Sequence, residues 1–316
     1  PKAAARPLPK GPNRILIYKN GHLVLIDPDG KNETRVTEDR DRFMPGTDAK
    51  LSPDGTRVAV LVARPRGPGE AGERHKLYVR TLGDPEPGTD TGVECEAVHW
   101  SATGAELVTV GVTGDDKAAV PTFAHRVVDA ATGAATRLDL PPGDAVNGWL
   151  ADGRFLTAHL SGTHAEPRSR LRLVARDGTP GKALTDGADL YDLAVPSPDG
   201  TRLLALRAAP PEKGADGRPE YDRPELVVVD AATGRAVPVD GVPLNGDLMG
   251  FCWSPDGTRI AYSWRQVHPG PAEDVRDRET ESHLVVADPD GRNPRTVLTE
   301  KGQGQWLITL GAPDWR

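Results

Sequence analysis

The sequence predicts an all-β protein, a six-bladed β-propeller in which every blade is a four-stranded antiparallel sheet. A short turn motif ending in glycine recurs at nearly regular spacing, and its last copy is divided between the two ends of the chain. Glycine and proline are also abundant, at 35 and 30 of the 316 residues, without a collagen repeat. That composition is typical of a protein built from many short strands and tight turns.

The turn motif sets the period of the repeat. It is clearest as Trp-Ser-Pro-Asp-Gly, and its copies occupy 51–55, 100–104, 149–153, 196–200 and 253–257. The turn glycines are 49, 49, 47 and 57 residues apart, a spacing that favours propeller blades over helical repeats. In the sixth copy, Pro313 to Trp315 supply the part before the turn and residues 9–17 the remainder. The C-terminal strand is therefore expected to complete the N-terminal blade and so close a ring.

Within each blade we expect strands of different character. The first strand ends at the turn motif, and the second follows it as an apolar run such as 202–206 or 259–263. The third strand is equally apolar, as at 226–230, and such runs are typical of sheets buried on both faces. The fourth is more polar, as at 295–299, which fits an outer edge protected from association with other sheets.

This pattern predicts a single domain over 1–316, with 1–10 as a flexible lead-in. The expected blades cover approximately 11–45 plus 305–316, 46–93, 94–143, 144–188, 189–246 and 247–304.

Two stretches carry a resemblance to a known family. The string from Trp253 to Tyr262, and residues 288–294 before Val297, resemble the WD40-like (PD40) repeats of the TolB-like six-bladed β-propeller family. The resemblance implies the ring closure described above and a role in protein interaction near the bacterial envelope. It therefore also favours a periplasmic or other extracytoplasmic compartment.

Composition excludes several classes of function. A net charge of −7 argues against a general nucleic-acid binder, which needs a basic surface to displace counterions from phosphates. No run of apolar residues is long enough to insert into a membrane. The two cysteines, Cys95 and Cys252, do not form a disulfide framework, and we expect two separate, buried thiols in a monomeric protein.

Binding is expected on the face that carries the connections between second and third strands. Long insertions there contrast with the tight turns of the opposite face, and long loops on a rigid scaffold commonly carry function. They cover 63–74, 111–124, 161–170, 208–224 and 266–282.

Polar residues gather in the segments that lead into the first strands. We expect them at the mouth of the central channel, where a ring of negative charge would attract a cation or a basic peptide. The candidate binding residues there are Asp48, Glu94, Glu96, His99, Asp144, Asp189, Tyr191 and Asp247. Trp264 and Arg265, at the start of the last insertion, are candidate anchors for a partner. The competing interpretation is a set of solvated loop acids.

No catalytic motif accompanies these residues. The chain has no Gly-x-Ser-x-Gly, His-x-His, His-Glu-x-x-His or Cys-x-x-Cys, so no catalytic residue, metal ligand or cofactor is assigned. The sequence therefore favours a non-enzymatic propeller that binds a protein or peptide. One alternative is a metal-assisted hydrolase or lyase with a site in the channel, and another is the propeller part of a larger sensor or peptidase.

Overall fold

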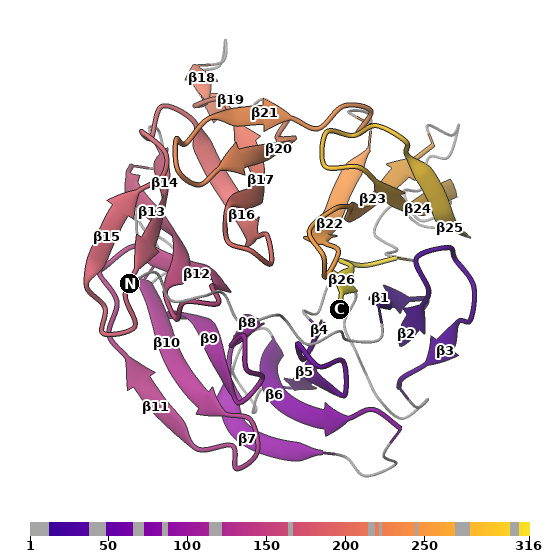
Figure 1. Ribbon diagram of the computed structural model, residues 1–316, viewed down its shortest axis with the longest axis horizontal. Coiled ribbons are helices and arrows are strands. Elements are labelled where there is room, and N and C mark those ends of the chain that lie inside the picture. Colours follow the sequence, from indigo (N-terminus) through magenta and orange to yellow (C-terminus); the bar gives the residue numbers. More distant parts are fainter. Residues whose placement is uncertain are drawn as a thin grey trace. The chain divides into compact units, whose positions relative to one another are not determined.

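In the computed structural model, strands account for every regular element of the described residues. The structure describes residues 13–37, 49–65, 73–83, 88–113, 122–163, 167–213, 219–220, 223–243, 246–268, 279–303 and 310–316. Within these ranges the strands form six four-stranded antiparallel sheets and one additional two-stranded sheet (Figure 1). The chain is therefore an all-β six-bladed propeller, as the sequence predicts. The described part contains no helix that could span a membrane.

The chain divides into two compact units, and each unit holds three of the four-stranded sheets. One unit spans Glu96–Val242. Its sheets are formed by β8 (Ala97–Trp100), β9 (Glu106–Thr113), β10 (Thr122–Asp129) and β11 (Ala135–Leu138); by β12 (Asp144–Trp149), β13 (Phe155–Gly162), β14 (Pro167–Val174) and β15 (Pro180–Ala183); and by β16 (Leu190–Pro196), β17 (Arg202–Ala208), β20 (Glu225–Asp230) and β21 (Ala236–Pro238). The hairpin of β18 (Glu212–Lys213) and β19 (Pro219–Glu220) connects β17 to β20.

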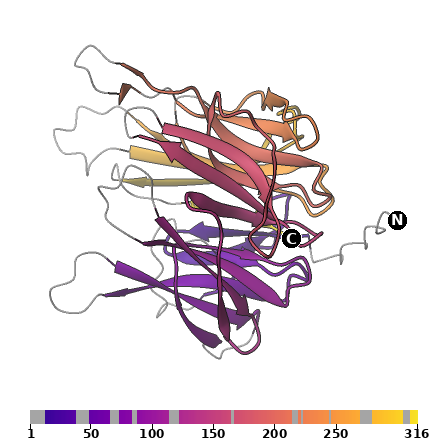
Figure 2. The same cartoon turned by 90° about the vertical axis from the view of Figure 1, so that its left-hand side faces the viewer.

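The other unit contains Pro9–Cys95 and Pro243–Arg316. Its sheets are formed by β26 (Asp314–Trp315), β1 (Ile15–Lys19), β2 (His22–Ile26) and β3 (Thr34–Arg35); by β4 (Ala49–Leu51), β5 (Arg57–Pro65), β6 (Glu73–Thr81) and β7 (Thr89–Glu94); and by β22 (Asp247–Trp253), β23 (Ile260–Val267), β24 (Glu279–Ala287) and β25 (Arg295–Gln303). Neighbouring strands of each sheet run side by side along their length (Figure 2).

The recurring Ser-Pro-Asp-Gly motif is a self-contained turn. In the copy between β22 and β23, the Ser254 hydroxyl donates to Asp256 Oδ1 at 2.6 Å and accepts from the Arg259 backbone N–H at 2.9 Å. Asp256 Oδ1 also accepts from the Thr258 N–H, and Gly257 has φ of 68°, a conformation that glycine adopts without a steric penalty. Burial opposes ionisation of Asp256, but the hydrogen bonds from Ser254 and Thr258 leave its pKa below the usual value. The motif therefore specifies the turn through its own side chains.

The closure of the N-terminal sheet follows the sequence prediction. β26 pairs with β1, so that Ile15 lies opposite Trp315 and Leu16 opposite Asp314. The Asp314 carboxylate then accepts a 2.7 Å hydrogen bond from the backbone N–H of Leu51 at the end of β4. The last residues of the chain thus supply the first strand of the sheet that begins at residue 15 and tie it to the next sheet.

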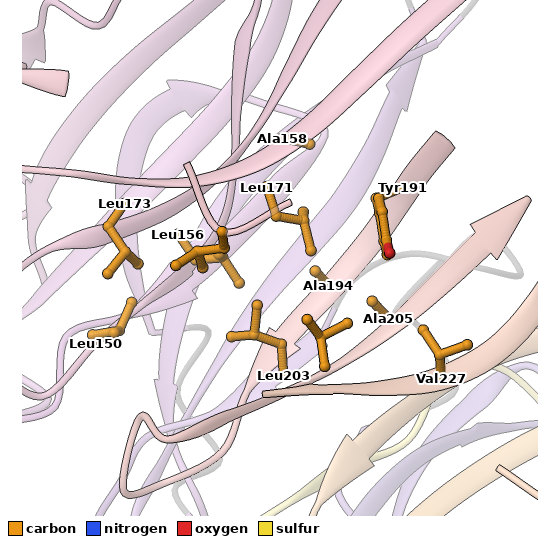
Figure 3. Packing of buried hydrophobic residues seen from close by; sticks show 12 residues of the cluster. Leu150, Leu156, Ala158, Leu171, Leu173, Tyr191, Ala194, Leu203, Ala205 and Val227 are labelled. Carbon is orange, nitrogen blue, oxygen red and sulfur yellow. The ribbon is translucent and has the colours of Figure 1, made fainter. Parts of the chain in front are cut away.

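Apolar side chains fill the space between adjacent sheets within each unit. Between the β12–β15 and β16–β21 sheets, Leu156 and Leu171 pack with Leu203 and Val227 in one cluster (Figure 3). Full burial of one such side chain stabilises a fold by about 1.5–3 kcal/mol. The tryptophans of the first strands are also buried, and Trp315 lies in the cluster that β1 and β2 form with β22 to β24. Cys95 and Cys252 are both buried and form no disulfide, as expected.

The second and third strands extend further than their apolar runs predict. The second strand predicted over 259–263 continues as β23 to Val267, and β24 already starts at Glu279, within the predicted insertion 266–282. In these extensions Glu281 pairs in register with Gln266 and Lys301, so polar side chains continue the hairpin ladder. The long insertions therefore begin and end as strands. Their central residues 66–72, 114–121, 164–166, 214–218 and 269–278 lie outside the described ranges.

Candidate functional site

The predicted site residues are divided between the two units. Glu96, His99, Asp144, Asp189 and Tyr191 belong to the unit that contains Glu96–Val242. The remaining candidates belong to the other unit: Glu94, Asp247, Trp264 and Arg265, together with Asp48, which lies outside the described residues. Most of the described candidates lie on or just before a first strand, whereas Glu94 ends β7 and Trp264 and Arg265 lie on β23, which leads into the last long insertion.

Asp144 is the centre of a buried polar cluster at the start of β12. Its side chain is 0% exposed, and its Oδ1 lies 3.1 Å from His159 Nδ1 on β13. Arg172 on β14 binds both carboxylate oxygens, with Nε 2.9 Å from Oδ1 and Nη2 2.5 Å from Oδ2. A buried carboxylate is tolerated when its charge is matched in this way. The imidazole of His159 and the guanidinium of Arg172 remain 28% and 17% exposed and form the outer surface of the cluster.

A second cluster surrounds Arg207 on β17. Its guanidinium donates to Glu225 on β20, through Nε at 3.0 Å and through Nη2, and its Nη1 lies 3.7 Å from Asp189. Tyr191 is directly opposite Arg207 in the ladder and is only 4% exposed, within the apolar cluster of Figure 3. Burial, with a further contribution from the charge of Asp189, raises the pKa of the Tyr191 hydroxyl. Tyr191 therefore packs in the core and presents no phenol at the surface.

His99 and Glu96 differ in their surroundings, although only two residues separate them. The His99 imidazole, on β8, lies 3.2 Å from the Val146 carbonyl oxygen of β12 through Nε2, which joins the two neighbouring first strands. Glu96 precedes β8 and is exposed. Its backbone N–H donates to the Val110 carbonyl at 2.7 Å. These two candidates are therefore not brought together as one chemical group.

In the other unit, Asp247 and Arg265 form an ion pair across β22 and β23. Arg265 Nη2 lies 2.5 Å from Asp247 Oδ2, and the two residues are opposite each other in the ladder. The Arg265 side chain is 11% exposed, whereas that of Asp247 is 61% exposed. The ion pair therefore presents a carboxylate at the surface and keeps the guanidinium inside. Glu94, at the end of β7, is exposed and pairs in register with Lys76.

Trp264 lies on the opposite side of β23 and is part of an aromatic stack. Its indole stacks on the His283 imidazole of β24, with ring centroids 4.5 Å apart and planes inclined by 23°. Glu281 contacts this stack, because its carboxylate lies 3.5 Å from His283 Nε2 and also 3.8 Å from His268 Nε2. Burial lowers the pKa of His283 although the charge of Glu281 opposes the shift. One face of β23 and β24 therefore carries an aromatic pair with a carboxylate beside it.

The partners of the candidate residues were not predictable from the sequence. Arg172, Arg207, His283 and Glu281 lie on second or third strands, far in sequence from the acids or tryptophan that they contact. The only signal available was a charged residue near the end of each apolar run. Leu193, on the first strand β16, was also missed and is 48% exposed, an unusual fraction for a leucine on an inner strand.

The described acids do not fit a metal centre. Arg172 occupies both oxygens of Asp144, and no group of at least three His, Cys, Asp or Glu side chains within the described ranges is arranged to hold a metal ion. The negative charges of Asp144, Asp189 and Asp247 are each matched by an arginine of the same sheet. These aspartate–arginine pairs are therefore fixed polar groups whose charges cancel.

Comparison with solved structures identifies the same architecture elsewhere. A protein assigned as TolB from Agrobacterium tumefaciens matches with a TM-score of 0.59 and 18% identity, covering 92% of this chain and 91% of that one. The chain shares the fold of a TolB-like β-propeller. An oligogalacturonate lyase in complex with manganese matches with a TM-score of 0.50 and 16% identity over 87% of this chain and 69% of that chain. A prolyl endopeptidase matches with a TM-score of 0.48 and 13% identity over 93% of this chain and 49% of that one.

The sequence itself matches no family model and no curated protein. At these identities the structural likeness extends to the fold alone.

Proposed function

We propose that the chain is a non-enzymatic propeller that binds a protein or peptide segment at the strand ends bordering its long insertions. The observation that carries this proposal is the Trp264–His283 stack, which is partly exposed and bordered by Glu281, His268 and Lys301. An aromatic group held on rigid strands and surrounded by polar groups is the composition of a protein-binding hot spot.

The ion pairs of the predicted acids support binding rather than catalysis. A buried carboxylate whose oxygens are bound by arginine, as in Asp144, is a poor metal ligand, and the ion pair that it forms is a fixed polar group suited to recognition. Asp247 presents a 61% exposed carboxylate on the strand adjacent to that of Trp264. Trp264 and Asp247 lie on opposite faces of this sheet, so a matching partner would cover the strand ends from both faces, with an apolar side chain for Trp264 and a basic side chain for Asp247.

Peptide selection tests the proposal without a known partner. Peptides from a random displayed library are selected on the full chain, and their affinities for variants are measured by fluorescence anisotropy. Trp264→Ala is expected to weaken the selected peptides at least about thirtyfold, because removing an anchoring tryptophan costs about 2 kcal/mol or more. Asp247→Asn should weaken basic peptides selectively.

The matched control is Arg292→Gln, because Arg292 is a surface residue in the tight turn before β25, with a 78% exposed side chain. It should leave peptide affinity unchanged. Selected peptides that bind the Trp264→Ala protein as tightly as the unaltered one would contradict the assignment.

The alternative of a metal-assisted hydrolase or lyase is tested by elemental analysis of protein purified without chelator. A stoichiometric divalent metal would favour that alternative.

A further inference from the structure

A polar pocket of about 390 Å³ lies at the tight turns of one unit, away from the strand ends that carry the proposed function. It is lined by Asn13, Asp27, Pro28, Asp29, Arg259 and Arg295. The aspartates and proline come from the turn between β2 and β3, and the arginines follow two turns of the β22–β25 sheet. The sequence pattern indicated no binding role for these turns.

The two arginines are fixed in place while most of their N–H groups are left available. Arg259 places its guanidinium carbon 5.1 Å from the ring centroid of the buried Trp315, and its side chain donates no hydrogen bond to any described residue. Arg295 donates one hydrogen bond, from Nη2 to the Pro28 carbonyl at 2.5 Å. Because a guanidinium carries five N–H donors, the pocket holds a marked excess of donors.

The acceptors near these arginines are already engaged. Asp27 is paired with Arg14 at 3.2 Å and accepts from Asn32 Nδ2 at 2.7 Å. Asp29 accepts from the backbone N–H of Lys31 and pairs with its ammonium, each at 3.1 Å. Asp256, three residues before Arg259, is the acceptor of the Ser254 and Thr258 hydroxyls. These acids therefore have hydrogen-bond partners other than the two arginines, although the charge of Arg295 also acts on Asp29 and that of Arg259 on Asp256.

Asn13 adds a donor of known orientation. Its Oδ1 accepts the indole N–H of Trp315 at 2.8 Å, which fixes the amide so that Nδ2, a donor, is the group left over. The pocket is also rigid at its rim, because a Cβ at Gly30 would lie 2.3 Å from the Val297 carbonyl oxygen of β25. The β2–β3 turn thus packs closely against the strand that carries Arg295.

We propose that this pocket binds a small anionic ligand through an oxyanion group, a carboxylate or a phosphate, held between Arg259 and Arg295. Planar guanidinium groups bind either oxyanion through paired N–H donors, and a ligand that supplies only acceptors fits the excess of donors. The volume is sufficient for a small organic anion or inorganic phosphate. The site is independent of the peptide-binding surface proposed above.

Isothermal titration of the full chain with inorganic phosphate and, separately, with succinate tests the site at matched ionic strength. The unaltered protein is expected to bind with one saturable site. Arg295→Gln should weaken that binding at least about tenfold, the loss expected for charge-assisted hydrogen bonds. Arg259→Lys should do the same, since lysine keeps the charge but cannot form the paired contact. Arg292→Gln is the matched control, because it removes a neighbouring arginine that does not line the pocket.

The proposal is supported if phosphate, succinate or both bind saturably and if the pocket variants, but not the control, weaken that binding. The anion that binds more tightly shows which oxyanion the site prefers. No saturable binding of either anion overturns it, as does equal weakening by Arg292→Gln. Arg295 is exposed, so Arg295→Gln keeps the test valid even if the change at Arg259 disturbs packing on Trp315. Thermal unfolding without ligand checks that each variant is folded.

Discussion

His125 should make the stability of this protein fall in mild acid. The residue lies on β10 opposite Val110 and Leu138, is 4% exposed, and its Nε2 is buried without a hydrogen-bond partner among the described residues. Its ring is 6.2 Å from that of Phe123. Burial of the imidazole lowers its pKa to about 4. The folded protein therefore keeps His125 neutral in a pH range where an exposed histidine takes up a proton.

The sign and size of the effect follow from linkage between folding and protonation. The unfolded chain protonates this histidine below about pH 6.5, whereas the folded chain does so only near pH 4. The free energy of unfolding that comes from keeping His125 neutral is therefore complete above about pH 6.5. It is lost as the pH falls from about 6.5 to about 4. Each pH unit removes about 1.4 kcal/mol, so the loss is about 2 kcal/mol at pH 5 and about 3 kcal/mol in total.

Urea unfolding followed by tryptophan fluorescence measures this loss. His125→Leu removes the titrating group at nearly constant volume, and the difference between the two free energies of unfolding cancels the contributions of other groups. The difference is expected to be constant above pH 7.5 and to move in favour of the variant by about 2 kcal/mol at pH 5. A difference that does not change with pH, or that changes in the opposite direction, would refute the reasoning.

Two further predictions concern packing and charge. Gly30→Ala should destabilise the protein more than Gly21→Ala: both glycines have positive φ, which costs alanine about 1–2 kcal/mol, but only at Gly30 does the new Cβ meet the Val297 carbonyl, at 2.3 Å. Equal losses in thermal unfolding would show that the turn can move away from β25. Arg172→Ala should cost about 3–5 kcal/mol, because it leaves the fully buried Asp144 carboxylate without its main counter-charge. The double change that also replaces Asp144 by Asn should recover much of the loss in urea unfolding, and no recovery would falsify the charge argument.

The repeated turn shows how much of the fold is local. Ser254, Asp256 and Gly257 make the turn by bonding to one another and to the next two residues, so the information is contained in one short stretch of chain. The apolar runs that follow each turn predicted the second and third strands for the same reason. The polar strand extensions were not predicted, because alternation of charged residues such as Glu281 is stabilised by partners on neighbouring strands.

The candidate site was predictable only as a set of residue types. The sequence indicated acids at the starts of first strands, but a ring of free negative charge was only one of the possible arrangements. Asp144 is bound instead by Arg172, which is 28 residues away, and Asp189 lies 3.7 Å from Arg207. Such pairs depend on strand register, which the sequence did not specify at the polar ends of the strands.

By itself the sequence determined the six four-stranded sheets, their internal order and the closure of the first sheet by Trp315, because turn chemistry and apolar runs are properties of neighbouring residues. Only the tertiary structure decided which charges neutralise one another, which face of β23 carries the Trp264 stack, and that Arg259 and Arg295 share one pocket. These residues are brought together by packing between strands and sheets, where the distance along the chain carries no information about the distance in space.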